Sequence, residues 1–131
     1  TIKIIEHSDD LIIVTNPELP AITDALKTVK LTEELGKNVL GILVTRTKND
    51  DLDISLRNIE AIIEKPVIGV IPEDDSLREA LSLKDSVIHT HPASKSSRAY
   101  KRLASTISGI SYSEPVKEDL ISKVWKFIIG R

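Results

Sequence analysis

The sequence predicts an α/β fold in which helices flank a parallel β-sheet. Three apolar runs of strand length, at residues 11–15, 39–45 and 66–71, alternate with segments of helical periodicity. The runs are continuously apolar, which is typical of strands that are covered on both faces. Strands that alternate with helices favour a parallel sheet with right-handed connections. The 131 residues and the 40% hydrophobic content fit one globular domain.

The N-terminal part of the chain is expected to contain one strand and one helix. The opening TIKIIEHS fits either a helix or a strand, and the run at residues 11–15 is the first clear strand. Residues 20–36 begin with a proline that suits a first helical turn and end with a glycine that suits a C-cap. The apolar residues of this segment recur at i, i+3, i+4 and i+7 and are Ile22, Ala25, Leu26 and Val29.

The rest of the chain continues the alternation. A helix is predicted over residues 54–64, and a short helix begins at Asp74. SVIHT, residues 86–90, indicates a weak fourth strand, and a helix follows over residues 93–107 before Gly109 ends it. The apolar face of the 54–64 helix consists of Ile54, Ile59, Ile62 and Ile63.

The composition excludes several kinds of site. The chain has no Cys, so it has no disulfide, no thiolate metal site and no cysteine nucleophile. His89 and His91 form a pair at most, whereas zinc sites need three or four ligands, so no metal site is predicted. A basic face of the 93–107 helix is interpreted as a solvated surface, and no nucleic-acid partner is expected. No apolar run approaches the roughly 18 residues of a membrane span.

Polar residues follow each of the three clear strands. The strands end in TNPE at 15–18, TRT at 45–47 and IPEDD at 71–75. Turn chemistry alone explains each loop when it is taken singly. In open α/β sheets, however, ligands bind beyond the carboxyl ends of the strands. Three polar loops at one edge therefore predict a ligand site there.

The C-terminal end of the chain is predicted to form a separate unit. GISYSEP, residues 109–115, is a predicted linker, and residues 116–131 form a predicted amphipathic helix. This tail carries four basic residues against two acidic ones, although the whole chain has a net charge of −2. The pattern favours a helix that lies on an anionic membrane surface, and the alternative is a helix docked on its own domain or in a partner's groove. The apolar arc consists of Leu120, Ile121, Val124, Trp125, Phe127 and Ile128.

Several stretches resemble a known family. They are VTNPELPAITDALK, LTEELGKNVLGILVTR, EKPVIGVIPEDDSLREAL and HPASKSSRAYKRLA, in this order. Together they resemble the C-terminal half of MinD-type ATPases, which are P-loop proteins of the MinD/ParA group that place the cell-division machinery. The resemblance covers nearly the whole chain. It implies an incomplete half of a P-loop NTPase fold, with residues 1–108 as the C-terminal part of the ATPase domain.

The resemblance also implies roles for individual residues. One group borders the adenine of a nucleotide, and a second group lies near an ATP-dependent dimer face that also receives a division regulator. The usual family Asn is a Thr at position 45, which weakens a base-specific contact. The tail matches the family's membrane-targeting helix, which implies a cytoplasmic protein that binds membranes peripherally. The implied nucleotide-binding residues are Thr45, Arg46, Pro72, Glu73 and Asp74, and those of the dimer and partner face are Glu18 and Asp24.

The sequence departs from the family in its catalytic parts. The five glycines are scattered and form no phosphate-binding loop. ATP or ADP with Mg²⁺ is thus expected in the complete protein and not in this segment alone, which has no predicted catalytic residue. The apolar strand at 11–15 is expected to need the missing N-terminal half or another copy of the chain as its partner. The alternatives are a segment of a ParA-type DNA-partitioning ATPase and a non-enzymatic, membrane-tethered adaptor.

Overall fold

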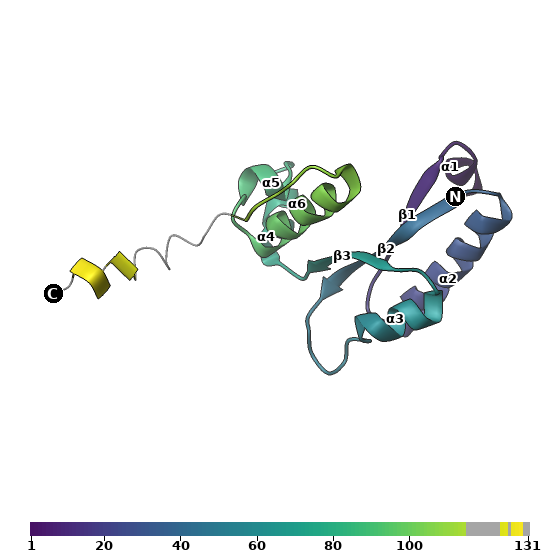
Figure 1. Cartoon of the computed structure of the whole chain (residues 1–131), viewed down its shortest axis with the longest axis horizontal. Coiled ribbons are helices and arrows are strands. Elements are labelled where there is room, and N and C mark those ends of the chain that lie inside the picture. Colours follow the sequence, from purple (N-terminus) through teal and green to yellow (C-terminus); the bar gives the residue numbers. More distant parts are fainter. Residues whose placement is uncertain (115–123, 126, 130–131) are drawn as a thin grey trace.

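The computed structural model describes residues 1–114, 124–125 and 127–129 (Figure 1). Helices and strands alternate along most of the described chain, as the sequence predicts. The elements are α1 (Ile2–Glu6), β1 (Asp10–Thr15), α2 (Leu19–Glu34), β2 (Asn38–Thr47), α3 (Leu56–Ile63), β3 (Val67–Pro72), α4 (Asp75–Ser82), α5 (Val87–Thr90) and α6 (Lys95–Ser108).

The sheet is parallel and has the strand order β1-β2-β3. Ile13 of β1 lies opposite Ile42 of β2, and Val44 of β2 lies opposite Val70 of β3. The predicted parallel α/β architecture is therefore confirmed. The strand β2 lies in the centre and is longer than the sequence indicates, because it continues to Thr47.

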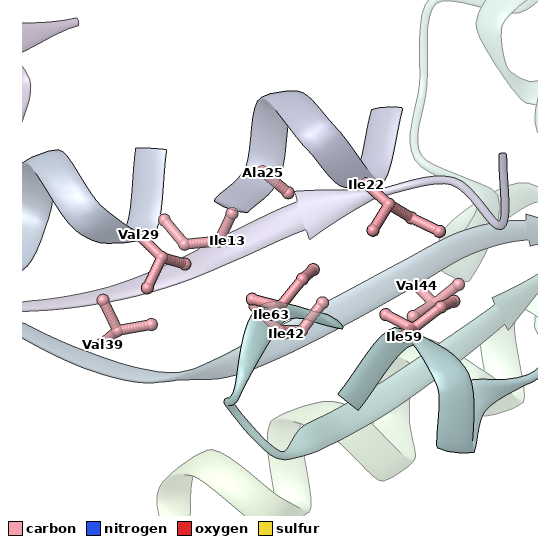
Figure 2. Packing of buried hydrophobic residues seen from close by; sticks show 9 residues of the cluster. All are labelled: Ile13, Ile22, Ala25, Val29, Val39, Ile42, Val44, Ile59 and Ile63. Carbon is pink, nitrogen blue, oxygen red and sulfur yellow. The ribbon is translucent and has the colours of Figure 1, made fainter. Parts of the chain in front are cut away.

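The larger part of the core lies between the sheet and the two helices α2 and α3. Ile22, Ile42 and Ile59 are fully buried there, and Figure 2 shows how side chains from both helices meet those of β1 and β2. Burying an aliphatic side chain of this size stabilises the fold by roughly 1.5–3 kcal/mol. The cluster consists of Ile13, Ile22, Ala25, Val29, Val39, Ile42, Val44, Ile59 and Ile63.

The helix α6 covers the other face of the sheet at β3. Leu43, Ile71 and Ala99 form a small core there, with Leu103 packed against it. Gly69 permits the close approach, since a Cβ at this position would lie 2.9 Å from Leu103 Cδ1. On β1, Ile12 also packs against this small core, whereas Val14 is exposed.

The structure corrects one predicted element. Residues 86–90 are not a strand, because Val87–Thr90 form the short helix α5. Ser86 caps this helix with its side-chain oxygen, which accepts a hydrogen bond from the His89 N–H group at 3.3 Å. The β-branched residues favoured a strand, but the local capping bond outweighs that preference. The ambiguous opening segment is also helical, as α1.

The described part of the C-terminal region is short. After α6, Gly109 adopts a left-handed conformation, and Ser105 Oγ donates a hydrogen bond to the Ile110 carbonyl group. Arg102 and Glu114 form an ion pair. Most of the predicted amphipathic helix, including Leu120 and Ile121, lies outside the described residues. Within the described residues, no helix has both the length and the apolar character to cross a membrane.

Candidate functional site

The carboxyl ends of the three strands lie side by side, and we call this end of the sheet the rim. Thr15 lies opposite Val44, Thr45 opposite Ile71. Because the strands are parallel and adjacent, the loops TNPE, TRT and IPEDD all begin at the rim. The register thus confirms the prediction that three polar loops share one side of the sheet.

Side-chain and backbone contacts join the first two loops. The Thr45 hydroxyl group lies 3.0 Å from Asn16 Oδ1 and 3.3 Å from the Thr15 carbonyl oxygen, and it donates to both. The Ile54 N–H group donates to the Pro17 carbonyl oxygen at 2.9 Å. Thr45 therefore fixes the exit of β1, and its hydroxyl group already has protein partners.

Arg46 interrupts the regular end of β2. Its φ angle is 58°, which lies in the left-handed region, and the pairing with β3 shifts between Thr45 and Thr47. Such a bulge re-aims the side chains that follow it. After the bulge, Thr47 pairs with Pro72. Arg46 itself has no partner residue on β3, and its side chain is exposed.

A cavity of about 600 Å³ lies at the rim between the ends of β2 and β3. This volume falls within the usual range of small-molecule sites, roughly 300–1,000 Å³. Pro72, Glu73 and Asp74 line it as part of the predicted set, whereas Thr45 and Arg46 do not. Of the other lining residues, Thr47 and Asp75 belong to the predicted polar loops TRT and IPEDD, whereas Lys48, Asn49 and Lys95 were not predicted.

Asp74 explains how Lys95 reaches the cavity from a distant part of the chain. One carboxylate oxygen of Asp74 caps α4 by accepting a hydrogen bond from the Ser76 N–H group at 3.0 Å. The other accepts hydrogen bonds from the N–H and hydroxyl groups of Ser96, each at 2.9 Å. Burial opposes ionisation of this carboxyl group, but the hydrogen bonds from Ser96 and Ser76 outweigh it and hold the pKa of Asp74 well below its ordinary value. Asp74 therefore joins α4 to the start of α6.

The remaining charges of the cavity are more exposed. Lys48 Nζ lies 3.6 Å from a carboxylate oxygen of Glu73, and both side chains are more than half exposed, so this ion pair contributes little to stability. The Glu73 N–H group donates to the Thr47 carbonyl oxygen at 3.0 Å, which fixes the backbone of the IPEDD loop against β2. Carboxylates outnumber lysines in the lining, by three to two.

A second cavity, of about 390 Å³, lies between β1 and α2. Its lining includes Val14, Asn16 and Asp24. Asp24, one of the two residues of the predicted dimer face, is therefore placed along the outer edge of the sheet. Glu18, the other one, is exposed and occupies the N-cap position of α2 without a capping hydrogen bond from its side chain.

The two histidines of the IHTHP segment have carboxylate partners. His89 Nδ1 lies 3.2 Å from Asp85, and His91 Nε2 lies 2.8 Å from Glu79. Residues 86–90 were expected to form a strand, but His89 lies in the helix α5 and His91 directly follows it. The described residues contain no group of three or more His, Cys, Asp and Glu side chains arranged to hold a metal ion.

Comparison with known proteins identifies the family. The family model described as an AAA domain matches residues 1–80. The chain belongs to this AAA-domain family. More specifically, this protein is a homologue of the MinD/ParA-type P-loop ATPases, as similar sequences and structures show.

Two curated relatives match the AAA-domain chain along nearly its full length. An uncharacterized ATP-binding protein of Methanocaldococcus jannaschii is 37% identical, with 100% of this chain and 51% of the relative covered. A putative septum site-determining protein MinD of Chlorella vulgaris is 27% identical, with 98% of this chain and 49% of the relative covered. The chain spans about half the length of these relatives.

Two solved structures share the fold of the AAA-domain chain. The septum site-determining protein MinD of Pyrococcus horikoshii, complexed with Mg-ADP, has a TM-score of 0.72 and 29% identity over 76% of this chain and 41% of its own. The MinC:MinD cell division protein complex of Aquifex aeolicus has a TM-score of 0.72 and 26% identity over 83% of this chain and 46% of its own. These likenesses support the three-stranded parallel sheet as part of a MinD-like P-loop NTPase fold.

Proposed function

We propose that this chain is the C-terminal half of a MinD-like ATPase that regulates where the cell divides. In this proposal the chain supplies the wall on the adenine side of the nucleotide site, part of a dimer face and a membrane-targeting helix. The observation that carries the proposal is the rim, where three polar strand ends lie together beside a cavity of small-molecule size. The likeness to MinD proteins of about twice the length supports it.

The nucleotide base is proposed to bind at the cavity. Pro72, Glu73 and Asp74 line it, and Thr45 and Arg46 lie just before the lining residues of β2. Hydrogen bonds at Asp74 and between Glu73 and Thr47 hold the loop in place, as a preorganised site requires.

The described residues fit a base better than they fit the phosphates and Mg²⁺ of ATP. A magnesium ion in such sites is held by carboxylates together with substrate phosphates, and phosphates need a glycine-rich loop with a lysine. The glycines of the chain form no such loop, and the described residues gather no metal-binding group. When bound, Mg²⁺ would neutralise the charge that develops on the phosphates during transfer. We therefore assign the phosphates and Mg²⁺ to the other half of the protein.

The outer edge of β1 is proposed to be the junction with that other half. β1 pairs with β2 alone within the described residues, so its second edge presents free backbone groups. Val14 is 58% exposed on this strand, and a cavity opens between β1 and α2. An apolar open edge favours pairing with another strand. The partner is the missing N-terminal half or, in its absence, another copy of the chain.

Glu18 and Asp24 are proposed to contribute to the face at which the ATP-bound protein dimerises and receives a division regulator. Both lie on or next to the first turns of α2, close to the rim. The solved MinC:MinD complex supports a regulator as partner. Dimerisation at the rim would place the bound nucleotide near the dimer face, so that nucleotide state controls assembly.

The tail is proposed to bind an anionic membrane surface from the cytoplasmic side. Val124, Trp125, Phe127 and Ile128 are exposed in the structure, with Trp125 at 58%. One short helix binds lipid weakly, but two helices joined in a dimer bind far more firmly. ATP-driven dimerisation would therefore recruit the protein to the membrane, and ADP would release it.

Nucleotide binding to the complete protein tests the proposal. A fluorescent ATP analogue with Mg²⁺ should bind the full-length protein in competition with ATP, and it should bind this chain alone much more weakly. Glu73→Lys is expected to weaken binding, whereas Glu34→Lys, on α2 and outside the cavity lining, should not. A complete protein that binds no nucleotide would favour the adaptor interpretation and contradict the proposal.

A further inference from the structure

Thr47 carries a hydroxyl group without a hydrogen-bond partner among the described residues. The side chain is only 5% exposed, and its hydroxyl oxygen is buried. A buried hydroxyl group without a partner lowers the stability of a folded protein, and native proteins contain few of them. The position of Thr47 therefore needs an explanation beyond packing.

The residue Thr47 lines the cavity at the rim, although its hydroxyl oxygen is buried. It lies at the end of β2, opposite Pro72 of β3. The bulge at Arg46 brings Thr47 to this place, because it shifts the pairing of the two strands by one residue. Thr45, by contrast, uses its hydroxyl group to hold the end of β1. Of these two threonines, Thr47 is the one whose hydroxyl group has no hydrogen-bond partner within the described residues.

The charges of the cavity indicate which ligand edge fits. The lining holds three carboxylates and two lysines, and Lys48 is already paired with Glu73. Carboxylates accept hydrogen bonds, so a ligand that presents an N–H donor to this lining fits it better than a ligand that presents a carbonyl oxygen. Rotation of the Thr47 side chain by about 120° about Cα–Cβ moves the hydroxyl oxygen to the position held by the methyl group or by the Cβ hydrogen, which turns the buried oxygen to another side without moving the backbone.

We propose that Thr47 is a specificity-determining residue whose hydroxyl oxygen accepts a hydrogen bond from the exocyclic amino group of a 6-aminopurine. The inference rests on the proposed function, because it assigns a contact within the same nucleotide site. It goes further in naming a residue that the resemblance to MinD did not assign. It also explains the unsatisfied hydroxyl group, which obtains its partner only when the base binds.

The proposal predicts that removing the Thr47 hydroxyl group affects the stability of the free protein and its affinity for ATP in opposite directions. Thr47→Val replaces the hydroxyl group by a methyl group of similar size. In the free protein this change removes an unsatisfied buried polar group, so resistance to urea should stay equal or rise. In the complex it removes the hydrogen bond, so ATP should bind more weakly. A purely structural role of the hydroxyl group would instead lower stability.

The experiment measures binding of two nucleotides to the full-length protein and its variants. ATP is compared with purine riboside triphosphate, which lacks the 6-amino group. The protein with Thr47 should bind ATP about tenfold more tightly than the analogue, as expected for one buried hydrogen bond. In Thr47→Val this preference should disappear through weaker ATP binding, and the matched variant Thr47→Ser should retain it.

Each other outcome has a defined meaning. If the unmodified protein binds ATP and Thr47→Val keeps the full preference for ATP, the contact at Thr47 is wrong while the proposed function stands. A loss of urea resistance in Thr47→Val would likewise overturn the contact, because the hydroxyl group would then be bonded within the protein. If the unmodified protein binds neither nucleotide, the proposed function fails and the contact fails with it.

Discussion

At the scale of single residues, Asp74 determines the geometry of the candidate site. Its two carboxylate oxygens accept hydrogen bonds from α4 and from the start of α6. Lys95, the residue before Ser96, consequently lines the same cavity as Glu73 although it lies far along the chain. The carboxylate thus acts as a structural link between two helices.

Asp74→Ala should therefore destabilise the fold. We expect a loss of about 2 kcal/mol, because a cap and an interhelix link disappear together. The effect should depend on pH. Since the pKa of Asp74 is lowered on folding, the stability that its ionised form contributes is fully present above the pKa of an unfolded aspartate, roughly 4. This contribution declines as the pH falls below that value and is lost as the pH passes through the lower pKa of the folded state. Urea unfolding at pH 7 and at pH 3 measures both effects.

Asp75→Ala is the matched control for this prediction. Asp75 is exposed and follows directly in the sequence. An exposed position of this kind changes stability by no more than about 0.5 kcal/mol. Equal losses for both variants, or a loss at Asp74 that does not shrink at low pH, would contradict the structural link.

At the scale of elements, the close packing of α6 on β3 depends on Gly69. Gly69→Ala would place a Cβ 2.9 Å from Leu103 Cδ1 and 3.0 Å from Leu43 Cδ1. Overpacking of this kind costs about 1–3 kcal/mol. Leu103→Ala should relieve most of the strain, so the double variant should be more stable than the sum of the single losses predicts. Additive losses in thermal unfolding would show that α6 does not rest on Gly69.

The tail is an element whose proposed role is also testable. Trp125→Glu should abolish sedimentation of the ATP-loaded full-length protein with anionic vesicles, since a charge replaces an exposed aromatic anchor. Leu52→Glu is the control, because Leu52 is 88% exposed in the loop between β2 and α3. Unchanged sedimentation of Trp125→Glu would favour docking of the tail on protein.

Periodicity and strand-like runs predicted most of the elements, but local sequence patterns did not reveal which residues come together at the cavity. The three strands and the helices α2, α3, α4 and α6 follow from local patterns that packing reinforces. The helix α5 was missed because a capping bond of Ser86 decides a segment of only four residues. Lys95 was missed because a long-range hydrogen bond of Asp74 places it at the cavity. Thr47 belongs to the predicted TRT loop, but no individual role was assigned to it, because a bulge at Arg46 brings it to the cavity.

At the scale of the whole molecule, the described sheet ends at the apolar strand β1, whose outer edge is unpaired among the described residues and on which Val14 is exposed. Alone, the chain should therefore associate with itself in size-exclusion chromatography. Val14→Lys should reduce this association without unfolding the protein, because Val14 is 58% exposed on β1 and a lysine protects such an edge. Leu52→Lys, away from β1, should leave it unchanged. A stable monomer of the unmodified chain would contradict an incomplete sheet.

The most direct test of the account is to locate the base in the complete protein. Photolysis with an azido-adenine analogue of ATP should label peptides that contain residues 45–49 and 71–75, and excess ATP should prevent the labelling. This result would place the purine at the rim of this chain. Labelling that is suppressed by ATP but maps away from both loops would contradict the assignment of this rim to the nucleotide base.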